Sequence, residues 1–335
     1  MNAATLKAPF PYFGGKRRAA ARIWKALGNP DHFVEPFAGS AAVLLARPDP
    51  ARCETINDAD GMVANFWRAI RSAPEAVAGW ADWPVNEVDL HARHLWLIGQ
   101  RESLTERLIA DPEWCDPKAA GWWVWGACAW IGDGWCSQPS RKLPHLGNEG
   151  RGIHVPSRQL PHVGDEGREL RAPRRGAAFA DDAVSFGSVR EWFAALSERL
   201  RPVRVCSGDW LRVLSGTVLF PSSMPKDSTC GVYLDPPYRE GSQDYAVGGT
   251  GTSLSAKVRA WCEEHGSNPR LRIVLSGYAG EHDALEDLGW RVEEWKTKGG
   301  YSSTSAASAN QRRERLWLSP ACVGARQRTI FDLLG

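Results

Sequence analysis

The 335-residue sequence lacks the features that mark several large protein classes. It has no run of eighteen apolar residues, and residues 1–11 contain no apolar core flanked by a cleavage site. A membrane span and a standard secretory signal are therefore not expected. The eight cysteines include no C-x-x-C pair, so we expect most of them to be buried thiols in a reducing compartment. Together these absences favour a cytoplasmic protein.

Common nucleotide-binding and zinc-binding motifs are also missing. Neither G-x-G-x-x-G nor G-x-x-x-x-G-K-[ST] occurs, which argues against dinucleotide cofactors and P-loop phosphate binding. Cys128 and Cys136 lie near His145, His154 and His162, but their spacing matches none of the usual zinc-finger patterns. We therefore expect no metal ion.

The composition is that of a folded protein, with 43% hydrophobic and 24% charged residues. The net charge of +2 says little about binding partners. The tryptophan content is unusual, with 17 tryptophans against 6 tyrosines. A chain of this length exceeds what one hydrophobic core usually carries, so we expect one large domain with an insertion or a second small domain.

Strand–turn–helix units are predicted at the start of the chain. Residues 33–35 form a short apolar strand, which is followed by a turn at 36–40 and by strong helix formers at 41–46. A second strand is predicted to end near Asp58. A helix should follow it, because apolar residues recur there at helical spacing, at Val63, Phe66, Trp67 and Ile70.

The same alternation returns from about residue 183. Ser188 and Glu191 form a capping-box pattern, and Pro202 should end the helix that they begin. Strands are predicted at 203–206, 231–234, 271–275, 291–295 and 315–318. Alternating strands and helices indicate an α/β fold with a mainly parallel sheet covered on both faces. The last two strands are joined by a polar loop without an obvious helix, so we expect them to be antiparallel.

The segment from about 73 to 182 has a different character. Its first part is rich in tryptophan, at Trp114, Trp122, Trp123, Trp125, Trp130 and Trp135. Its second part contains the repeat L-P-H-x-G-x-E-G-R at 143–151 and again at 160–168. Residues 139–175 hold eight lysines and arginines against four acidic residues, so the positive charge is concentrated there.

The tetrapeptide D-P-P-Y at 235–238 carries the most chemical information. It directly follows an apolar strand, which places it at the carboxyl edge of the sheet, where open α/β folds bind ligands. Asp235 and the Pro236 carbonyl can accept hydrogen bonds from an amino group on a planar ring, and Tyr238 can stack on that ring. Such acceptors localise the nitrogen lone pair and stabilise the positive charge that develops on attack. The alternative is an ordinary strand-to-loop turn.

Two further motifs fit a nucleoside ligand. The turn E-P-F-A-G-S at 35–40 contains a glycine, where backbone can approach a ligand closely. Asp58 stands at the end of the next predicted strand, where an acid receives ribose hydroxyls in nucleotide-binding folds. Taken alone, Asp58 could equally be a helix N-cap. Because the pyrophosphate fingerprints are absent, an adenosine ligand without a pyrophosphate fits better.

In this order the motifs resemble those of the alpha-group DNA adenine N6-methyltransferases. The resemblance rests on P-F-P-Y-F-G-G-K at 9–16, F-V-E-P-F-A-G-S at 33–40, N-D at 57–58, S-G-D-W at 207–210 and D-P-P-Y at 235–238. It implies a Rossmann-like S-adenosylmethionine-dependent methyltransferase sheet, mostly parallel with one antiparallel strand. It also implies an inserted target-recognition domain. We expect the methyltransferase domain at 1–75 and 183–320, the insertion at 76–182 and a tail at 321–335.

The resemblance also implies residue roles. The residues that would hold the target base are Asp235, Pro236, Pro237 and Tyr238, with Ser276, Gly277 and Tyr278 walling the pocket. Those that would hold S-adenosyl-L-methionine are Tyr12, Gly14, Gly15, Lys16, Glu35, Pro36, Phe37, Ala38, Gly39, Ser40, Asp58, Asp209 and Trp210. Tyr12 stands where the family usually has tryptophan, which puts its stacking role in doubt.

Each role has a plainer alternative. Lys16 could be a solvated lysine. The residues at 276–278 could simply end a buried strand. The tryptophans of the middle segment fit a role in the core of the insertion better than a role in base stacking. The basic residues could form an ordinary surface, but we favour contact with DNA phosphates because their charge is localised. These residues are Arg141, Lys142, Arg151, Arg158, Arg168, Arg174 and Arg175.

The sequence thus predicts an enzyme that methylates the N6 amino group of adenine at specific sites in double-stranded DNA. The target base should flip out of the helix. A monomer is expected, and a cognate restriction nuclease is a candidate partner. The same chemistry would serve a cytosine-N4 methyltransferase or an enzyme that methylates RNA or protein amides. A non-catalytic DNA-binding relative is an alternative of a different class.

Overall fold

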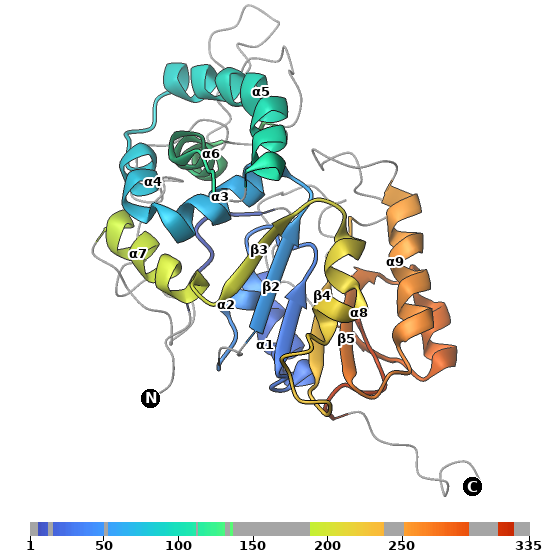
Figure 1. Ribbon diagram of the computed structural model, residues 1–335. Coiled ribbons are helices and arrows are strands. Elements are labelled where there is room, and N and C mark those ends of the chain that lie inside the picture. The colour runs from blue at the N-terminus through green and yellow to red at the C-terminus, as the bar shows by residue number, and fades with distance from the viewer. Residues whose placement is uncertain are drawn as a thin grey trace, which may run out of the picture. The chain divides into compact units, whose positions relative to one another are not determined.

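The structure, a computed structural model, describes residues 6–12, 16–49, 53–111, 113–130, 135–136, 188–237, 251–294 and 314–324. It contains a seven-stranded sheet in the order β3-β2-β1-β4-β5-β7-β6. The strands are β1 (His32–Glu35), β2 (Cys53–Asp58), β3 (Val203–Ser207), β4 (Cys230–Leu234), β5 (Leu271–Tyr278), β6 (Arg291–Glu294) and β7 (Glu314–Leu318) (Figure 1).

The pairing confirms the expected Rossmann-like methyltransferase sheet. Strand β1 is parallel to β2 and to β4, and β4 is parallel to β5. Strand β7 is antiparallel to both of its neighbours, β5 and β6, as expected for the final pair. The structure therefore has a mostly parallel sheet with one antiparallel strand.

The order of the strands reverses between β1 and β4. The chain leaves β1 for β2 and β3 on one side, and then returns to β4 on the other side of β1. In open α/β sheets, ligands bind at the carboxyl ends of the strands at such a reversal. The predicted turns at 36–40 and 235–238 follow these two strands directly.

The chain divides into two compact units, which are described separately. The first comprises Met1–Gly15, Asp58–Gly208 and Asp244–Val247, and the second comprises Lys16–Asn57, Asp209–Gln243 and Gly248–Gly335. The domain boundaries expected from composition stay a prediction.

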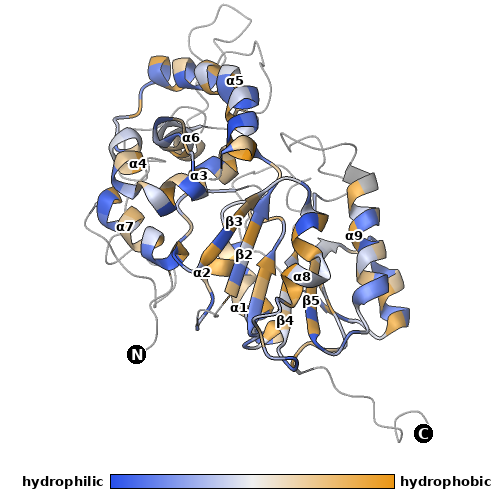
Figure 2. Cartoon of the chain, viewed as in Figure 1, coloured by the Kyte–Doolittle hydropathy of each residue, from blue (hydrophilic) through white to orange (hydrophobic). Residues whose placement is uncertain are grey.

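In the second unit, both faces of the sheet are covered. Successive side chains of a strand point to opposite faces. The ring of Phe33 packs on Trp24 of α1 (Ala20–Leu27), with 4.7 Å between ring centroids, whereas Nδ1 of the adjacent His32 lies 3.1 Å from the Leu219 carbonyl of α8 (Gly216–Leu219). Every residue of β1 and β4 is buried, as parallel strands covered on both faces require. Figure 2 shows the hydrophobic residues along these strands.

The remaining elements of this unit are mostly short. They are η1 (Lys16–Arg18), α2 (Ala42–Leu45), η2 (Trp210–Leu214), α9 (Gly251–His265) and η4 (Asp283–Leu288). Helix α2 is shorter than the helix formers at 41–46 predict. Ala41 adopts a left-handed conformation with φ of 50°, so the helix cannot begin there. Pro48 disfavours helical backbone in the residue before it, which limits extension at the other end.

The described residues of the first unit form five helices, strand β3 and the last residue of β2. Its helices are α3 (Gly61–Ser72), α4 (Pro74–Ala81), α5 (Glu87–Ala110), α6 (Pro117–Ala129) and α7 (Val189–Leu200). The four residues that predicted α3 are all buried, and the Ser188 hydroxyl accepts from the Glu191 amide at 3.2 Å at the start of α7. A Cβ at Gly121 would lie 2.4 Å from the Trp80 Cβ, so α4 and α6 approach too closely for any larger residue at that position.

The tryptophans of the middle segment belong to the helical core of this unit. Trp123 and Trp125 are buried, and Trp114, Trp122, Trp130 and Trp135 are half-buried. Trp123 packs on Phe10 and Phe66, with ring centroids 4.8 and 5.9 Å apart. These contacts favour the core interpretation over base stacking. None of the described helices is long and apolar enough to cross a membrane.

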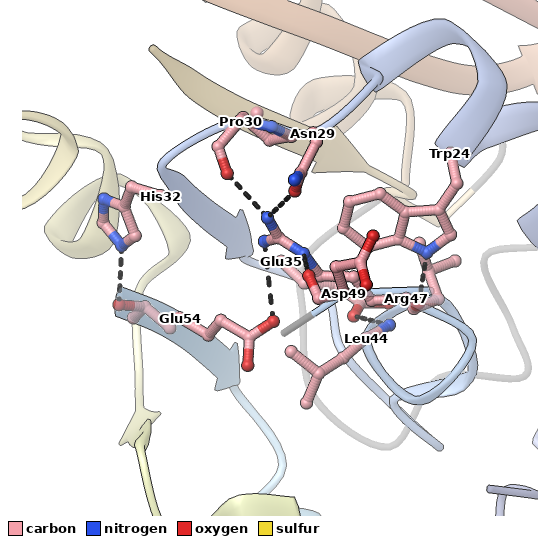
Figure 3. A network of polar contacts seen from close by, with 12 residues as sticks. Trp24, Asn29, Pro30, His32, Glu35, Leu44, Arg47, Asp49 and Glu54 are labelled. Carbon is pink, nitrogen blue, oxygen red and sulfur yellow. Dashed lines mark hydrogen bonds and ion pairs between the residues drawn. The ribbon is translucent and has the colours of Figure 1, made fainter. Parts of the chain in front are cut away.

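A buried arginine ties together three segments that precede and follow the turn at 36–40 (Figure 3). Arg47 Nη2 donates to the Asn29 side chain at 2.9 Å and to the Pro30 carbonyl at 2.6 Å. Its Nη1 lies 3.5 Å from Glu54 Oε1 of β2, and both side chains are at most 1% exposed. The guanidinium thus links the start of β1, the end of α2 and β2.

We predict that Arg47→Met lowers the free energy of unfolding by about 3–5 kcal/mol, because it leaves the buried Glu54 carboxylate without its counter-charge. Urea unfolding followed by tryptophan fluorescence would measure this change. Arg201→Met is the matched control, since Arg201 and Glu198 form an exposed pair in which the side chains are 78% and 72% exposed. That control should cost less than about 1 kcal/mol. Equal effects of the two substitutions would refute the structural role of Arg47.

Candidate active site

The candidate site lies at the carboxyl ends of β1 and β4. Val34 is the register partner of Val232, so Glu35 and Leu234 end neighbouring parallel strands within one residue of each other. The turns at 36–40 and 235–237 therefore begin side by side. Residues about 200 positions apart in sequence come together here, all within the second unit.

The turn after β1 is held in place by the neighbouring strand and by its own helix. The Ala38 amide donates to the Asn57 carbonyl at 2.9 Å, and the Asn57 side chain donates to the Pro36 carbonyl at 3.0 Å. Glu35 Oε2 accepts from the Leu44 amide at 3.1 Å. Gly39 is left-handed with φ of 46°, a conformation that glycine adopts at little cost. The turn is thereby fixed at both ends.

A carboxylate and an aromatic pair line this turn. Glu35 is 2% exposed. Phe37 stacks on Trp210, with ring centroids 5.8 Å apart and planes inclined by 29°. Asp209, directly before Trp210, is exposed and accepts from the Leu211 amide at 2.9 Å. Ala38 and Ser40 are buried at the same turn. The site thus offers two carboxylates and a flat apolar surface.

The turn after β4 carries a partly buried ion pair. Lys16 Nζ lies 3.0 Å from Asp235 Oδ1, and the two side chains are 4% and 19% exposed. Lys16 is therefore not a solvated lysine. The pair joins the N-terminal motif to D-P-P-Y directly, a connection that the sequence did not predict. Pro236 is buried and Pro237 is half-buried beside it.

Two acidic groups next to this ion pair have perturbed pKa values. Burial is the main cause that raises the pKa of Tyr233 well above its usual range, and the charge of Asp235 adds to it. The Tyr233 hydroxyl lies 2.8 Å from Ser276 Oγ, and that hydrogen bond acts in the opposite direction. Burial also raises the pKa of Glu314; Lys16 lowers it and Asp235 raises it. Burial thus favours the neutral form of both groups.

Two further residues of the predicted cofactor set, Tyr12 and Asp58, belong to the first unit and are described within it. Tyr12 packs edge-on against Phe10, with ring centroids 6.2 Å apart. Asp58 Oδ1 accepts from the Asp60 amide at 2.9 Å, while Asp60 is the residue that caps α3. The N-cap alternative for Asp58 is therefore wrong, and its ribose role stays a prediction.

Several predicted residues lie outside the part of the chain that the structure describes. They are Gly14, Gly15, Tyr238, the repeats at 143–151 and 160–168, and the basic residues Arg141, Lys142, Arg151, Arg158, Arg168, Arg174 and Arg175. Gly277 and Tyr278 end β5 together with Ser276, so the strand-end alternative for these residues is correct. It does not exclude their role as a pocket wall, because they end at the same edge as β4.

Sequence reasoning missed Tyr233 and Glu314. Tyr233 lies in a strand whose sequence is apolar, and only its hydroxyl group distinguishes it from the neighbouring strand residues. Glu314 precedes the predicted last strand by one residue, whereas β7 begins with it. Glu314 lies beside the end of β5, because it is the register partner of Tyr278. That pairing across strands is not visible in the local sequence.

A double-mutant cycle would test the ion pair. We predict that Lys16→Met and Asp235→Asn show a coupling energy of about 1–3 kcal/mol in unfolding, because the pair is largely removed from water. The reference pair is Arg259 and Glu263, whose side chains lie 3.4 Å apart and are about 40% exposed. Its coupling should stay near 0.5 kcal/mol or less. A coupling of similar size in both cycles would contradict the contact.

Comparison with known families finds a similarity in the N-terminal part of the chain. The family model described as D12 class N6 adenine-specific DNA methyltransferase matches residues 12–81, which contain Lys16, the turn at 36–40 and Asp58. No curated protein matches the chain. The matched segment spans β1 and β2 of a sheet with the mostly parallel order described above. Residues 12–81, about a fifth of the chain, are thus similar to the adenine-specific DNA methyltransferases of the D12 class.

Proposed function

We propose that the protein transfers the methyl group of S-adenosylmethionine to N6 of a flipped adenine at specific sites in double-stranded DNA. The observation that carries this proposal is the position of Asp235, Pro236 and Pro237 beside the turn at 36–40. That position brings acceptors for an amino group next to a turn suited to a nucleoside. A monomer acting on duplex DNA is part of the proposal.

The residues of the second unit fit the proposed cofactor. Its methionine portion carries an ammonium group, which the buried Glu35 carboxylate would bind, with Phe37, Ala38, Gly39 and Ser40 around it. Its adenine would lie against the aromatic pair of Phe37 and Trp210, and its amino group would donate to Asp209. S-adenosylmethionine, when bound, supplies a methyl group on a positively charged sulfur.

The residues at β4 would act on the target base. Asp235 and the Pro236 carbonyl accept hydrogen bonds from the N6 amino group and draw it toward tetrahedral geometry. The Asp235 carboxylate would face the positive charge that develops on the nitrogen when the nitrogen takes the methyl group and the carbon–sulfur bond of the cofactor breaks. One amino proton leaves after the transfer, along the hydrogen bond to Asp235. Because the amino group is held in the stack of duplex DNA, the base must flip out to reach this position.

We predict that Asp235→Ala abolishes methyl transfer and leaves the affinity for S-adenosylmethionine within about threefold, because the side chain serves the base rather than the cofactor. Incorporation of label from S-adenosylmethionine into mixed-sequence duplex DNA measures methyl transfer by the purified protein. Calorimetry measures the affinity for S-adenosylmethionine. Asp287→Ala is the control, since Asp287 is an exposed acid of η4 in the same unit. It should methylate at the wild-type rate.

The modified nucleoside, identified by mass, separates the alternatives. N6-methyladenine supports the proposal, and N4-methylcytosine keeps the chemistry but changes the base. Cofactor binding without incorporation into DNA would turn attention to RNA and protein amides. Failure to bind the cofactor at all would favour a non-catalytic DNA-binding relative. Near-normal turnover by the Asp235→Ala variant would refute the role of Asp235.

A further inference from the structure

Asp58, which we expect to receive the ribose of the cofactor, stands in a turn that hydrogen bonds hold in place. The residue is half-buried and ends β2. Its carbonyl accepts from the Gly208 amide at 3.1 Å, and its Oδ1 accepts from the Asp60 amide at 2.9 Å. The direction of the Asp58 carboxylate therefore depends on where the backbone of Asp60 lies.

Asp60 is in turn held by donors from two different helices. Its Oδ1 caps α3 by accepting from the Met62 amide at 2.9 Å. The same oxygen lies 2.9 Å from Nη1 of Arg101 in α5, and the side chains of Arg101 and Asp60 are 21% and 15% exposed. Hydrogen bonds between charged partners are stronger than those between neutral ones. The ion pair thus ties the start of α3 to α5.

The guanidinium of Arg101 is also held at its other end. Its Nη2 donates to the Cys136 carbonyl at 2.6 Å. Cys136 is buried and left-handed, with φ of 56°, and its amide donates to Nδ1 of the buried His94 of α5 at 3.3 Å. The planar fork of an arginine can bridge two such partners in one geometry, which a lysine cannot do.

A close contact between the same two helices supports this arrangement independently of the ion pair. A Cβ at Gly61, the first residue of α3, would lie 2.3 Å from Oγ1 of Thr105. Thr105 lies one turn after Arg101, and its hydroxyl donates to the Arg101 carbonyl at 2.8 Å. Residues four apart share one face of a helix. The turn that carries Asp58 is therefore followed directly by a helix that begins against this face of α5.

We propose that Arg101 is a positioning residue for cofactor binding: through Asp60 it holds the Asp58 carboxylate in the direction that receives the ribose hydroxyls. Helix α5 belongs to the region that the sequence predicts as the target-recognition insertion, so that region serves the cofactor as well. This inference rests on the proposed function, because it requires Asp58 to bind the ribose. Arg101 itself acts through Asp60 and is not assigned a contact with the cofactor.

The test measures binding rather than methylation. The probe is S-adenosylhomocysteine, which keeps the adenosine portion of the cofactor and has no methyl group to transfer. Its 2′,3′-dideoxy derivative lacks both ribose hydroxyls, and calorimetry measures the affinity for each. We expect Arg101→Met to weaken binding of S-adenosylhomocysteine about tenfold, because a hydrogen bond to a charged group is lost or misaligned. Binding of the dideoxy derivative should change by less than about twofold, since that ligand has no hydroxyls for Asp58 to receive.

Arg101→Lys keeps a positive charge beside Asp60 and should restore part of the preference for the hydroxylated ligand. A second variant leaves Arg101 in place. Gly61→Ala should also reduce the preference, because its Cβ pushes the start of α3 away from Thr105 Oγ1. Adding Thr105→Ala removes that hydroxyl and leaves a contact of 3.3 Å with the Thr105 Cβ, so the double variant should regain the preference. If Arg101→Met does not fold, these two variants decide the question.

Arg107→Met is the matched control, because Arg107 is an exposed arginine of the same helix whose guanidinium lies 4.5 Å from the centre of the Trp114 ring. It should bind both ligands as the wild type does. Asp58→Asn should remove the preference. If it does so while Arg101→Met keeps the wild-type preference, or weakens both ligands equally, the inference alone is refuted. An Asp58→Asn variant that keeps the preference, or a wild-type protein that binds neither ligand, would refute the proposed cofactor site and the inference with it.

Discussion

The parallel pairing of β1 with β4 is the constraint on which the site depends. It brings the turn at 36–40 next to Asp235, although about 200 residues separate them in the chain. Parallel neighbours cannot be joined by a short hairpin, so the connection between them has room for the whole helical unit. Both strands are buried throughout, and Arg47 joins the segments that flank β1 to β2. The apolar interior thus determines where the polar residues of the edge lie.

Charge balance is the second organising feature. At this edge Lys16 pairs with Asp235. Burial raises the pKa of Tyr233, and the charges of Asp235, Glu35 and Glu314 add to that effect. Negative charges close to Tyr233 disfavour its ionisation, as burial does. In the proposed function, a carboxylate at this edge would stabilise the positive charge that develops on the base.

Much of the fold could be predicted from sequence because the signals were local. Each strand was expected within a few residues of its observed bounds, and the Ser188 cap and the four apolar residues of α3 behave as predicted. The site was predicted only where its residues follow strands directly, as Glu35 and Asp235 do. Lys16 and Glu314 reach the site through pairing of distant segments, which no local pattern encodes. The short α2 was missed because left-handed Ala41 is set by its surroundings and not by helix propensity.

Several unfavourable features lie in the second unit. They are left-handed Ala41, the largely buried Lys16 and the Glu314 Oε2 atom, which has no hydrogen-bond partner among the described residues. Strained backbone and poorly solvated charges cost free energy, and a fold retains them only where its surroundings impose them. In the second unit those surroundings are the apolar strands β1 and β4 and the Arg47 network beneath the turn. The stable part of the sheet therefore supports an edge that would be unstable by itself, and that edge is where the proposed function places the transfer of the methyl group.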